Sequence, residues 1–386
     1  MKRFKLFKIG FFIVFSLLLI SYAHAGSLPD EWTEINPADY GFEYNGLTPA
    51  CSNAPGTPDD EFTFFVKGGK KKNKKNLVIF FQGGGGCWDY SNCVAVPTYT
   101  QYQQEELWWF SDDNEGRGIF DQTRKDNPFK DWGFVYIPYC TGDVFWGAND
   151  AEYGDFEIQH RGFVNFQAVL TYLEKNTKRP KKIFVTGSSA GSYGATLAFP
   201  HVKESFPKSK VYLLGDAGNG IMGGTFPDYG IYNWNVQVPE WIFPGGYDPT
   251  LTLDVIYTEI AAEYPRSPMA QYTTAYDGTQ IWFYNVMLNI GAPGAWGNIT
   301  QGIIDEWYDT MIDFAYNTAA ESPNYRYYIA AGTDHTILMS PKFYTEKSAE
   351  GVSFAKWVKE MIKTPKNLKK RNLKKWKNLE CENCFP

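Results

Sequence analysis

Residues 182–198 have the pattern of a strand, a tight turn and a helix, and this stretch constrains the fold more than any other. The β-rich run Lys182–Thr186 leads into Gly187-Ser188-Ser189-Ala190-Gly191, and a helix-compatible run follows to Ala198. A G-x-S-x-G pentapeptide in this setting is the pattern of a nucleophile elbow, which places a serine on the turn. The glycines are needed because such a turn crowds backbone against backbone and leaves no space for Cβ atoms. Ser189 is therefore the candidate nucleophile.

Apolar, β-branched and aromatic runs alternate with stretches of helical periodicity along the chain. This alternation predicts an α/β fold with a mostly parallel sheet flanked by helices. In such sheets, ligands bind beyond the carboxyl ends of the strands. Aromatic residues gather in the connecting segments, so large aromatic-rich loop insertions are expected. The expected strands are 62–66, 77–81, 133–139, 182–186, 210–214 and 325–330, and the expected helices are 163–174, 253–264, 303–319 and 353–362.

The first 25 residues have the pattern of a secretory signal peptide. Four basic residues precede an apolar stretch from Ile9 to Ile20, and Ala23-His24-Ala25 offers a small-x-small cleavage site. The stretch is too short for a lasting membrane span, so we predict that residues 1–25 are removed and that the protein is secreted or periplasmic. Removing four of the 37 Lys+Arg leaves 33 against 43 Asp+Glu, a net charge of −10. This charge argues against nucleic acid as a partner.

No linker, internal repeat or composition break divides the chain before a basic C-terminal stretch. We expect one catalytic domain over residues 26–362, a basic tail over residues 363–386, and a monomer. Lys363–Lys377 holds eight Lys/Arg residues and is interpreted as a solvated, frayed terminus, with docking to an anionic polymer or membrane surface as the alternative. A second lysine cluster, Lys67–Lys75, lies between two expected strands and is interpreted as a hairpin tip.

All six cysteines lie beyond the predicted leader, and an exported compartment favours their pairing. A zinc site at the terminal CxxC would lack a second CxxC or a histidine pair, and a redox role would lack a thioredoxin-like setting. We therefore predict disulfides and no metal. Spacing suggests two short loops and elimination gives the third pair, so the expected disulfides are Cys87–Cys93, Cys381–Cys384 and Cys51–Cys140.

A serine nucleophile needs an imidazole base nearby, and three histidines lie beyond the predicted leader. His160 precedes an expected helix and is interpreted as a helix-entry or packing residue. His201 lies about two to three turns along the helix that follows the elbow, away from the turn. His335 follows the last expected strand, where a hydrolase with the chain order Ser…Asp…His places its base. We predict His335 as the base, with a structural histidine as the alternative.

Two carboxylates compete to orient that imidazole. Asp277 lies in a loop before a predicted helix, and Asp216 ends the strand that follows the elbow helix. Both lie between Ser189 and His335 in the chain, and spacing does not separate them. Asp334 shares a turn with His335 and is poorly placed to accept its ring N–H.

Four successive glycines, Gly83–Gly86, follow the expected strand 77–81. Backbone N–H groups in such a run can approach closely and point at one spot, as an oxyanion hole requires. We predict Gly85, Gly86 and Ala190 as the donors. Simple turn chemistry is the alternative interpretation of the glycine run.

These pieces together resemble the pectin acetylesterase family, which includes the Notum carboxylesterases. The resemblance implies an α/β-hydrolase-like fold with Ser189 as nucleophile, Asp277 as orienting acid and His335 as base. It also implies that Asp216 is a structural residue that supports the catalytic residues without being one of them. The matching stretches are Gln82–Trp88, Tyr139–Asp143, Gly187–Gly191, Asp216–Gly218, Tyr276-Asp277 and Asp334-His335.

The resemblance implies a secreted serine carboxylesterase that removes short acyl groups, acetyl above all, from a carbohydrate, without a metal or organic cofactor. The expected partner is an acylated carbohydrate. Members with the best-known activity carry Glu-Gly-Gly-Gly-Trp-Cys-Trp at the glycine motif, where this chain has Gln82 and Gly86 in place of the acid and the first tryptophan. Pectin specificity is therefore not carried over. The alternatives are a deacylase for longer chains on lipid or protein, and a non-catalytic carbohydrate-binding protein.

Overall fold

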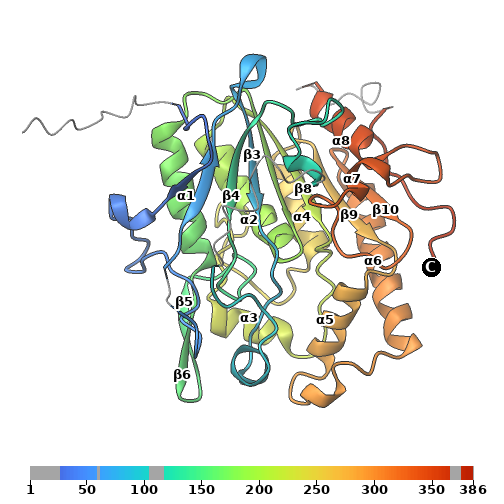
Figure 1. The fold of residues 1–386 in the computed structure, drawn as a ribbon. Coiled ribbons are helices and arrows are strands. Elements are labelled where there is room, and N and C mark those ends of the chain that lie inside the picture. The colour runs from blue at the N-terminus through green and yellow to red at the C-terminus, as the bar shows by residue number, and fades with distance from the viewer. Residues whose placement is uncertain (1–26, 59–60, 104–116, 366–374, 386) are drawn as a thin grey trace, which may run out of the picture.

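The computed structural model describes residues 27–58, 61–103, 117–365 and 375–385, so the predicted signal peptide lies outside the described residues. An eight-stranded mixed sheet has the order β1-β2-β4-β3-β7-β8-β9-β10 (Figure 1). β1 (Thr33–Ile35) pairs antiparallel with β2 (Phe64–Lys67), which pairs antiparallel with β4. The remaining pairs are parallel, among β4 (Gly133–Ile137), β3 (Asn76–Phe81), β7 (Lys182–Ser188), β8 (Lys210–Asp216), β9 (Met269–Thr274) and β10 (Tyr325–Ala330).

Helices cover both faces of this sheet, because successive strand residues point to opposite sides. Ile79 and Phe81 pack into one core cluster, and Val78 and Phe80 pack into the other. The first cluster is covered by α1 (Gly162–Asn176), α2 (Ala190–Ser205), α4 (Leu253–Glu263) and α6 (Gln301–Glu321), and the second by α7 (Lys342–Thr345) and α8 (Phe354–Lys363). The architecture is the predicted α/β-hydrolase-like fold.

A hairpin and two further helices lie beyond the carboxyl ends of the parallel strands. In Figure 1 the loop before β3 lies at the top, so these strands run downward, and the elements named here lie at the bottom. They are the antiparallel hairpin of β5 (Asn149–Tyr153) and β6 (Phe156–His160), together with α3 (Phe226–Trp234) and α5 (Gly278–Leu288). Short 3₁₀ turns occupy Pro37–Tyr40, Lys71–Asn73, Gly118–Phe120 and Pro293–Ala295, and a π-helical turn occupies Ser91–Ala95.

The interpretation of Lys67–Lys75 as a hairpin tip is wrong. β2 and β3 are not neighbours, because β4 lies between them and pairs with both. The lysine-rich stretch is instead a crossing connection that contains the 3₁₀ turn Lys71–Asn73. Two β-rich runs separated by a short polar loop predict a hairpin from local pattern alone, and here the pairing with a distant strand prevails.

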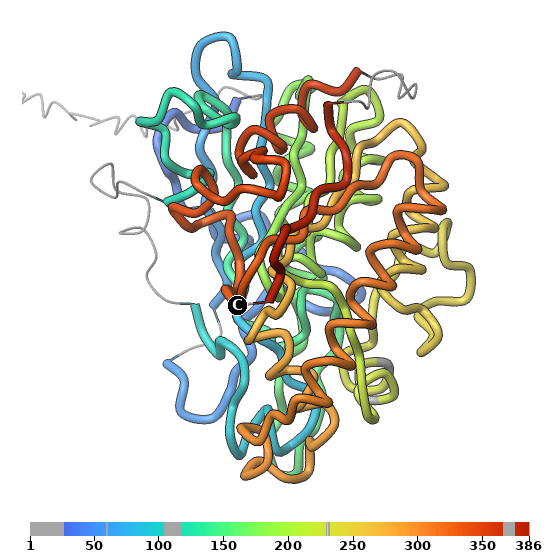
Figure 2. Tube along the Cα trace, turned by 90° about the vertical axis from the view of Figure 1, so that its right-hand side faces the viewer, coloured from blue at the N-terminus to red at the C-terminus, as the bar shows by residue number. Residues whose placement is uncertain are grey.

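The end of the chain returns to the sheet, in contrast to the expected solvated tail. Trp376 and Leu379 are buried, and Leu379 exchanges backbone hydrogen bonds with β10 through Tyr327 and Ile329. Figure 2 shows this segment as the dark-red tube beside β10. It covers the sheet edge, which would otherwise present unpaired backbone groups. Most of the basic stretch, residues 366–374, lies outside the described residues.

The three expected disulfides are present, and they are Cys51–Cys140, Cys87–Cys93 and Cys381–Cys384. Cys87–Cys93 closes a loop directly after the glycine run, and Cys381–Cys384 closes one beside the edge strand. Within the described ranges, the helices are all too short or too polar to cross a bilayer.

Candidate active site

Ser189 lies on the tight turn between β7 and α2, as the pentapeptide predicts. Its backbone has φ 56° and ψ −124°, a left-handed conformation that is strained for a residue with a side chain. A Cβ atom on Gly191 would lie 2.0 Å from the Phe81 carbonyl oxygen, and one on Gly187 would lie 2.2 Å from the Gly191 carbonyl oxygen. The Ser189 N–H donates to the Asp216 carbonyl at 2.7 Å, which holds the turn against β8.

His335 and Asp277 form a close pair. His335 Nδ1 lies 2.9 Å from each carboxylate oxygen of Asp277. Asp277 is fully buried and also caps α5, where it accepts the N–H groups of Thr279 and Gln280 at 3.1 and 3.0 Å. The Gln280 side chain donates to its other oxygen at 3.0 Å. Three N–H donors therefore fix this carboxylate, and the carboxylate in turn fixes the imidazole ring through Nδ1.

The second ring nitrogen of His335 is left for another partner. His335 Nε2 is buried, and among the described residues it has no hydrogen-bond partner. Ser189 and His335 line the same pocket, but no hydrogen bond joins them in the described part of the chain. Such contacts are often long without substrate and tighten in the reacting complex.

The glycine run reaches the same pocket through Gly85 and Gly86. Gly85 has φ 76°, and a Cβ atom there would lie 2.1 Å from the Thr98 carbonyl oxygen, so only glycine fits. The Gly86 N–H donates to that carbonyl at 3.3 Å, whereas within the described ranges the Gly85 N–H makes no hydrogen bond. Ala190 is the first residue of α2, where a backbone N–H has no acceptor within the helix. The backbone N–H groups of Gly85 and Ala190 are therefore more available to an oxyanion than that of Gly86.

Asp216 lies behind the elbow rather than beside the His335 ring. It is fully buried, accepts a hydrogen bond from Ser188 Oγ at 2.6 Å, and accepts the backbone N–H groups of Ile337 and Leu338 at 3.0 and 2.9 Å. Burial raises the pKa of Asp216 to about 6, while these hydrogen bonds act to lower it. At neutral pH it is thus a buried carboxylate.

The other two histidines lie outside this constellation. Both His160 ring nitrogens are engaged, one with Tyr153 Oη and one with the Thr141 carbonyl, each at 2.8 Å. Burial lowers the pKa of His160 to about 4, and it does the same to His201. His160 approaches Cys87 and Cys93 closely enough for a shared metal. Because those thiols are joined in a disulfide and the ring is already bonded, these residues do not fit a metal ion.

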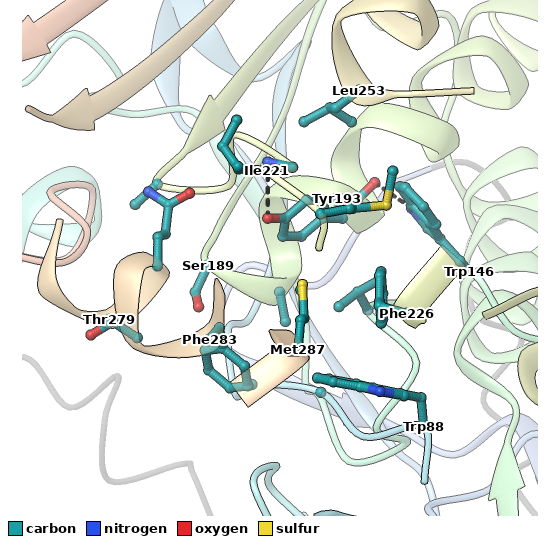
Figure 3. A pocket seen from close by; sticks show the side chains of 18 of the residues that line it. Trp88, Trp146, Ser189, Tyr193, Ile221, Phe226, Leu253, Thr279, Phe283 and Met287 are labelled. Carbon is teal, nitrogen blue, oxygen red and sulfur yellow. Dashed lines mark hydrogen bonds between the residues drawn. The ribbon is translucent and has the colours of Figure 1, made fainter. Parts of the chain in front are cut away.

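An apolar cavity of about 80 Å³ extends from Ser189. On a scale where one water needs about 10–15 Å³, this volume holds roughly five to eight heavy atoms. In Figure 3, Ser189 lies at one side, and Phe226, Met287 and Trp88 line the side opposite. Further lining comes from Val144, Trp146, Tyr193, Ile221, Met222, Trp234, Leu251, Leu253, Phe283 and Trp307. Several aromatic residues of the connecting segments thus line the cavity.

A family model described as Pectinacetylesterase matches residues 59–223. Over this stretch the chain is similar to the pectinacetylesterase family. This is a family of carboxylic ester hydrolases, so the match indicates an enzyme of that class, and the α/β-hydrolase-like sheet agrees with it. No curated protein matches the sequence.

The pectinacetylesterase match covers the glycine run, the elbow and Asp216, whereas Asp277 and His335 lie beyond its last residue. The assignment of the last two thus depends on the geometry alone. Sequence reasoning missed Gln280, which binds Asp277 and also lines the cavity. Its one available signal was its position in the first turn of a predicted helix, three residues after Asp277.

Proposed function

We propose that this protein is an exported serine carboxylesterase that hydrolyses short acyl esters, acetyl above all, of a carbohydrate. The observation that carries the proposal is the His335–Asp277 pair, whose unpartnered Nε2 shares a pocket with the strained Ser189 turn. The match of residues 59–223 to the pectinacetylesterase family model supports the ester chemistry. The three disulfides and the leader pattern support export.

In the proposed reaction, Ser189 Oγ attacks the ester carbonyl carbon while His335 Nε2 takes its proton. The carbonyl oxygen becomes an oxyanion, which accepts hydrogen bonds from the backbone N–H groups of Gly85 and Ala190. Collapse of the tetrahedral intermediate breaks the bond to the alcohol, which leaves with the proton from His335. Water then attacks the acyl-enzyme, its proton passes through His335 to Ser189 Oγ, and the free acid departs.

Asp277 acts in both halves of the reaction without exchanging a proton. It accepts the Nδ1–H of His335, so that Nε2 is the basic nitrogen, and it stabilises the imidazolium that forms when Nε2 is protonated. These roles need no metal and no organic cofactor.

The cavity favours a second candidate, a deacylase for longer chains on lipid or protein. Its lining is mostly aromatic and aliphatic, and its volume exceeds the need of an acetyl group, which has three heavy atoms. Burying each additional methylene there would contribute about 0.8 kcal/mol to binding.

The experiment compares the wild-type protein with Ser189→Ala on p-nitrophenyl acetate, butyrate and octanoate and on a peracetylated monosaccharide. We expect Ser189→Ala to lower kcat at least about 10⁴-fold on every ester. Ser209→Ala is the matched control, because this buried hydroxyl binds the Pro180 carbonyl away from the cavity. The acetyl esters should give the highest kcat/KM, and a preference for octanoate would favour the second candidate. Undiminished turnover by Ser189→Ala would refute both, and an inactive wild-type protein would favour the carbohydrate-binding alternative.

A further inference from the structure

Asp216 contacts both halves of the proposed machinery. It ends β8, and its backbone carbonyl accepts the N–H of Ser189 at 2.7 Å. Its carboxylate accepts Ser188 Oγ, the side chain next to the nucleophile. The same carboxylate accepts the N–H groups of Ile337 and Leu338, which follow His335 by two and three residues. In this way one residue ties the Ser189 turn to the His335 loop.

The His335 loop needs such a support on its C-terminal side. Thr336 has φ 66°, a left-handed conformation that is an outlier for a β-branched residue. This conformation precedes the two N–H groups that converge on Asp216, and successive N–H groups beside such a residue form an anion-binding concavity. The carboxylate therefore satisfies donors that the strained turn leaves without a helix or sheet partner.

The N-terminal side of the loop is held separately, by the Asp277 segment. Tyr276 N donates to the Gly332 carbonyl at 3.0 Å, and Gly278 N donates to the Thr333 carbonyl at 3.1 Å. Thr274 Oγ1 donates to the Asp334 carbonyl at 2.7 Å. These contacts align His335 with Asp277, but they make no contact with the elbow. The hydrogen bonds of Asp216, in contrast, connect the His335 loop to the Ser189 turn and so fix their relative position.

We propose that Asp216 is a positioning residue, which sets the distance between His335 Nε2 and Ser189 Oγ by binding the elbow and the His335 loop at once. This inference rests on the proposed function. A misplacement of about 1 Å between reacting groups costs about 100-fold in rate. Loss of the tie should therefore lower kcat while leaving substrate binding in the cavity largely intact.

The test compares Asp216→Asn and Asp216→Ala with the wild-type protein in kcat, KM and Tm on p-nitrophenyl acetate. Asparagine keeps one acceptor oxygen, so we expect a kcat loss of about 10-fold for Asp216→Asn and about 100-fold for Asp216→Ala, with KM within threefold. The matched control is Asn324→Ala. Asn324 is buried and donates to the carbonyls of Ala261, Tyr264 and Ser267 near the start of β10, at the opposite end of the sheet. It should lower Tm and leave kcat unchanged.

A wild-type kcat in folded Asp216→Asn would overturn the inference, as would a loss that Asn324→Ala reproduces at equal Tm. If neither Asp216 variant folds, Ser188→Ala decides, because it removes the 2.6 Å bond and keeps the carboxylate. We expect Ser188→Ala to lower kcat about threefold to tenfold. An unchanged kcat would contradict the proposed positioning role of Asp216. Failure of the proposed function looks different, since Ser189→Ala would then remain active.

Discussion

At the scale of single residues, the decisive question is which carboxylate serves His335. Asp216 ends β8, Asp277 follows β9, and both precede His335 in the chain, so chain order alone does not distinguish them. The structure separates them by partner. Asp277 meets the ring at Nδ1, whereas Asp216 binds backbone N–H groups and a serine hydroxyl. The sequence could not decide this, because the choice depends on how each loop turns after its strand.

Asp277 has two duties, and one substitution should separate them. In Asp277→Asn the side-chain oxygen can still cap α5, but an amide N–H₂ facing Nδ1 would favour the wrong imidazole tautomer. We expect kcat to fall about 10²- to 10⁴-fold, with a stability loss of about 1–3 kcal/mol because the amide also faces the Gln280 side-chain N–H that the carboxylate accepts. Thr300→Ala is the matched control, because Thr300 caps α6 through Ile303 N. Its loss should cost about 1 kcal/mol of stability and no activity. An Asp277→Asn variant within threefold of the wild-type kcat would contradict the assignment.

At the scale of elements, the sequence predicts strands well where they are continuously apolar. All six expected strands are present, with shifts of one or two residues at some ends. The strand β9 was missed, because Gln271, Thr273 and Thr274 make its sequence polar. Those side chains are buried, and beside the site Thr273 accepts a hydrogen bond from Gln280 and Thr274 donates one to the Asp334 carbonyl. The β5–β6 hairpin was also missed, since its charged residues alternate with few apolar ones.

The helix α2 carries His201, and the surroundings of this side chain predict that the stability of the protein falls at acid pH. The His201 ring lies 5.2 Å from that of Phe163 and 5.0 Å from that of Trp241, measured between centroids. Its Nε2 has no hydrogen-bond partner within the described ranges. Burial lowers the pKa of His201 to about 4, against about 6.5 in an unfolded chain. The unfolded state therefore binds more protons between these values, and stability is lost as pH falls from about 6.5 to about 4.

We expect His201→Phe to reduce this acid sensitivity. The free energy of unfolding should drop less between pH 8 and pH 5 than in the wild-type protein, by about 2 kcal/mol. Urea unfolding at the two pH values measures the difference. Trp241→Phe is the control, because it alters the packing against His201 and keeps the titrating ring. An unchanged pH dependence in His201→Phe would show that His201 does not titrate as argued.

At the scale of the whole molecule, the parallel sheet brings distant segments to one edge. The glycine run follows β3, the elbow follows β7, Asp277 follows β9 and His335 follows β10. The sequence predicts this edge from the order of strands and motifs, because carboxyl ends of parallel strands meet there. It does not predict the cavity, whose lining comes from five helices, α2 to α6, and several loops. Nor does it predict the return of residues 375–385 to the sheet, since a lysine-rich stretch precedes them.

The central claim is that Ser189 is a nucleophile activated by His335, and covalent labelling tests it most directly. The wild-type protein, Ser189→Ala and His335→Ala are treated with a fluorophosphonate probe at neutral pH, and the modified residue is located by peptide mass spectrometry. We predict one adduct, on Ser189, that Ser189→Ala lacks and that forms at least about 100-fold more slowly in His335→Ala. An unlabelled wild-type protein, or an adduct that persists in Ser189→Ala, would contradict the account.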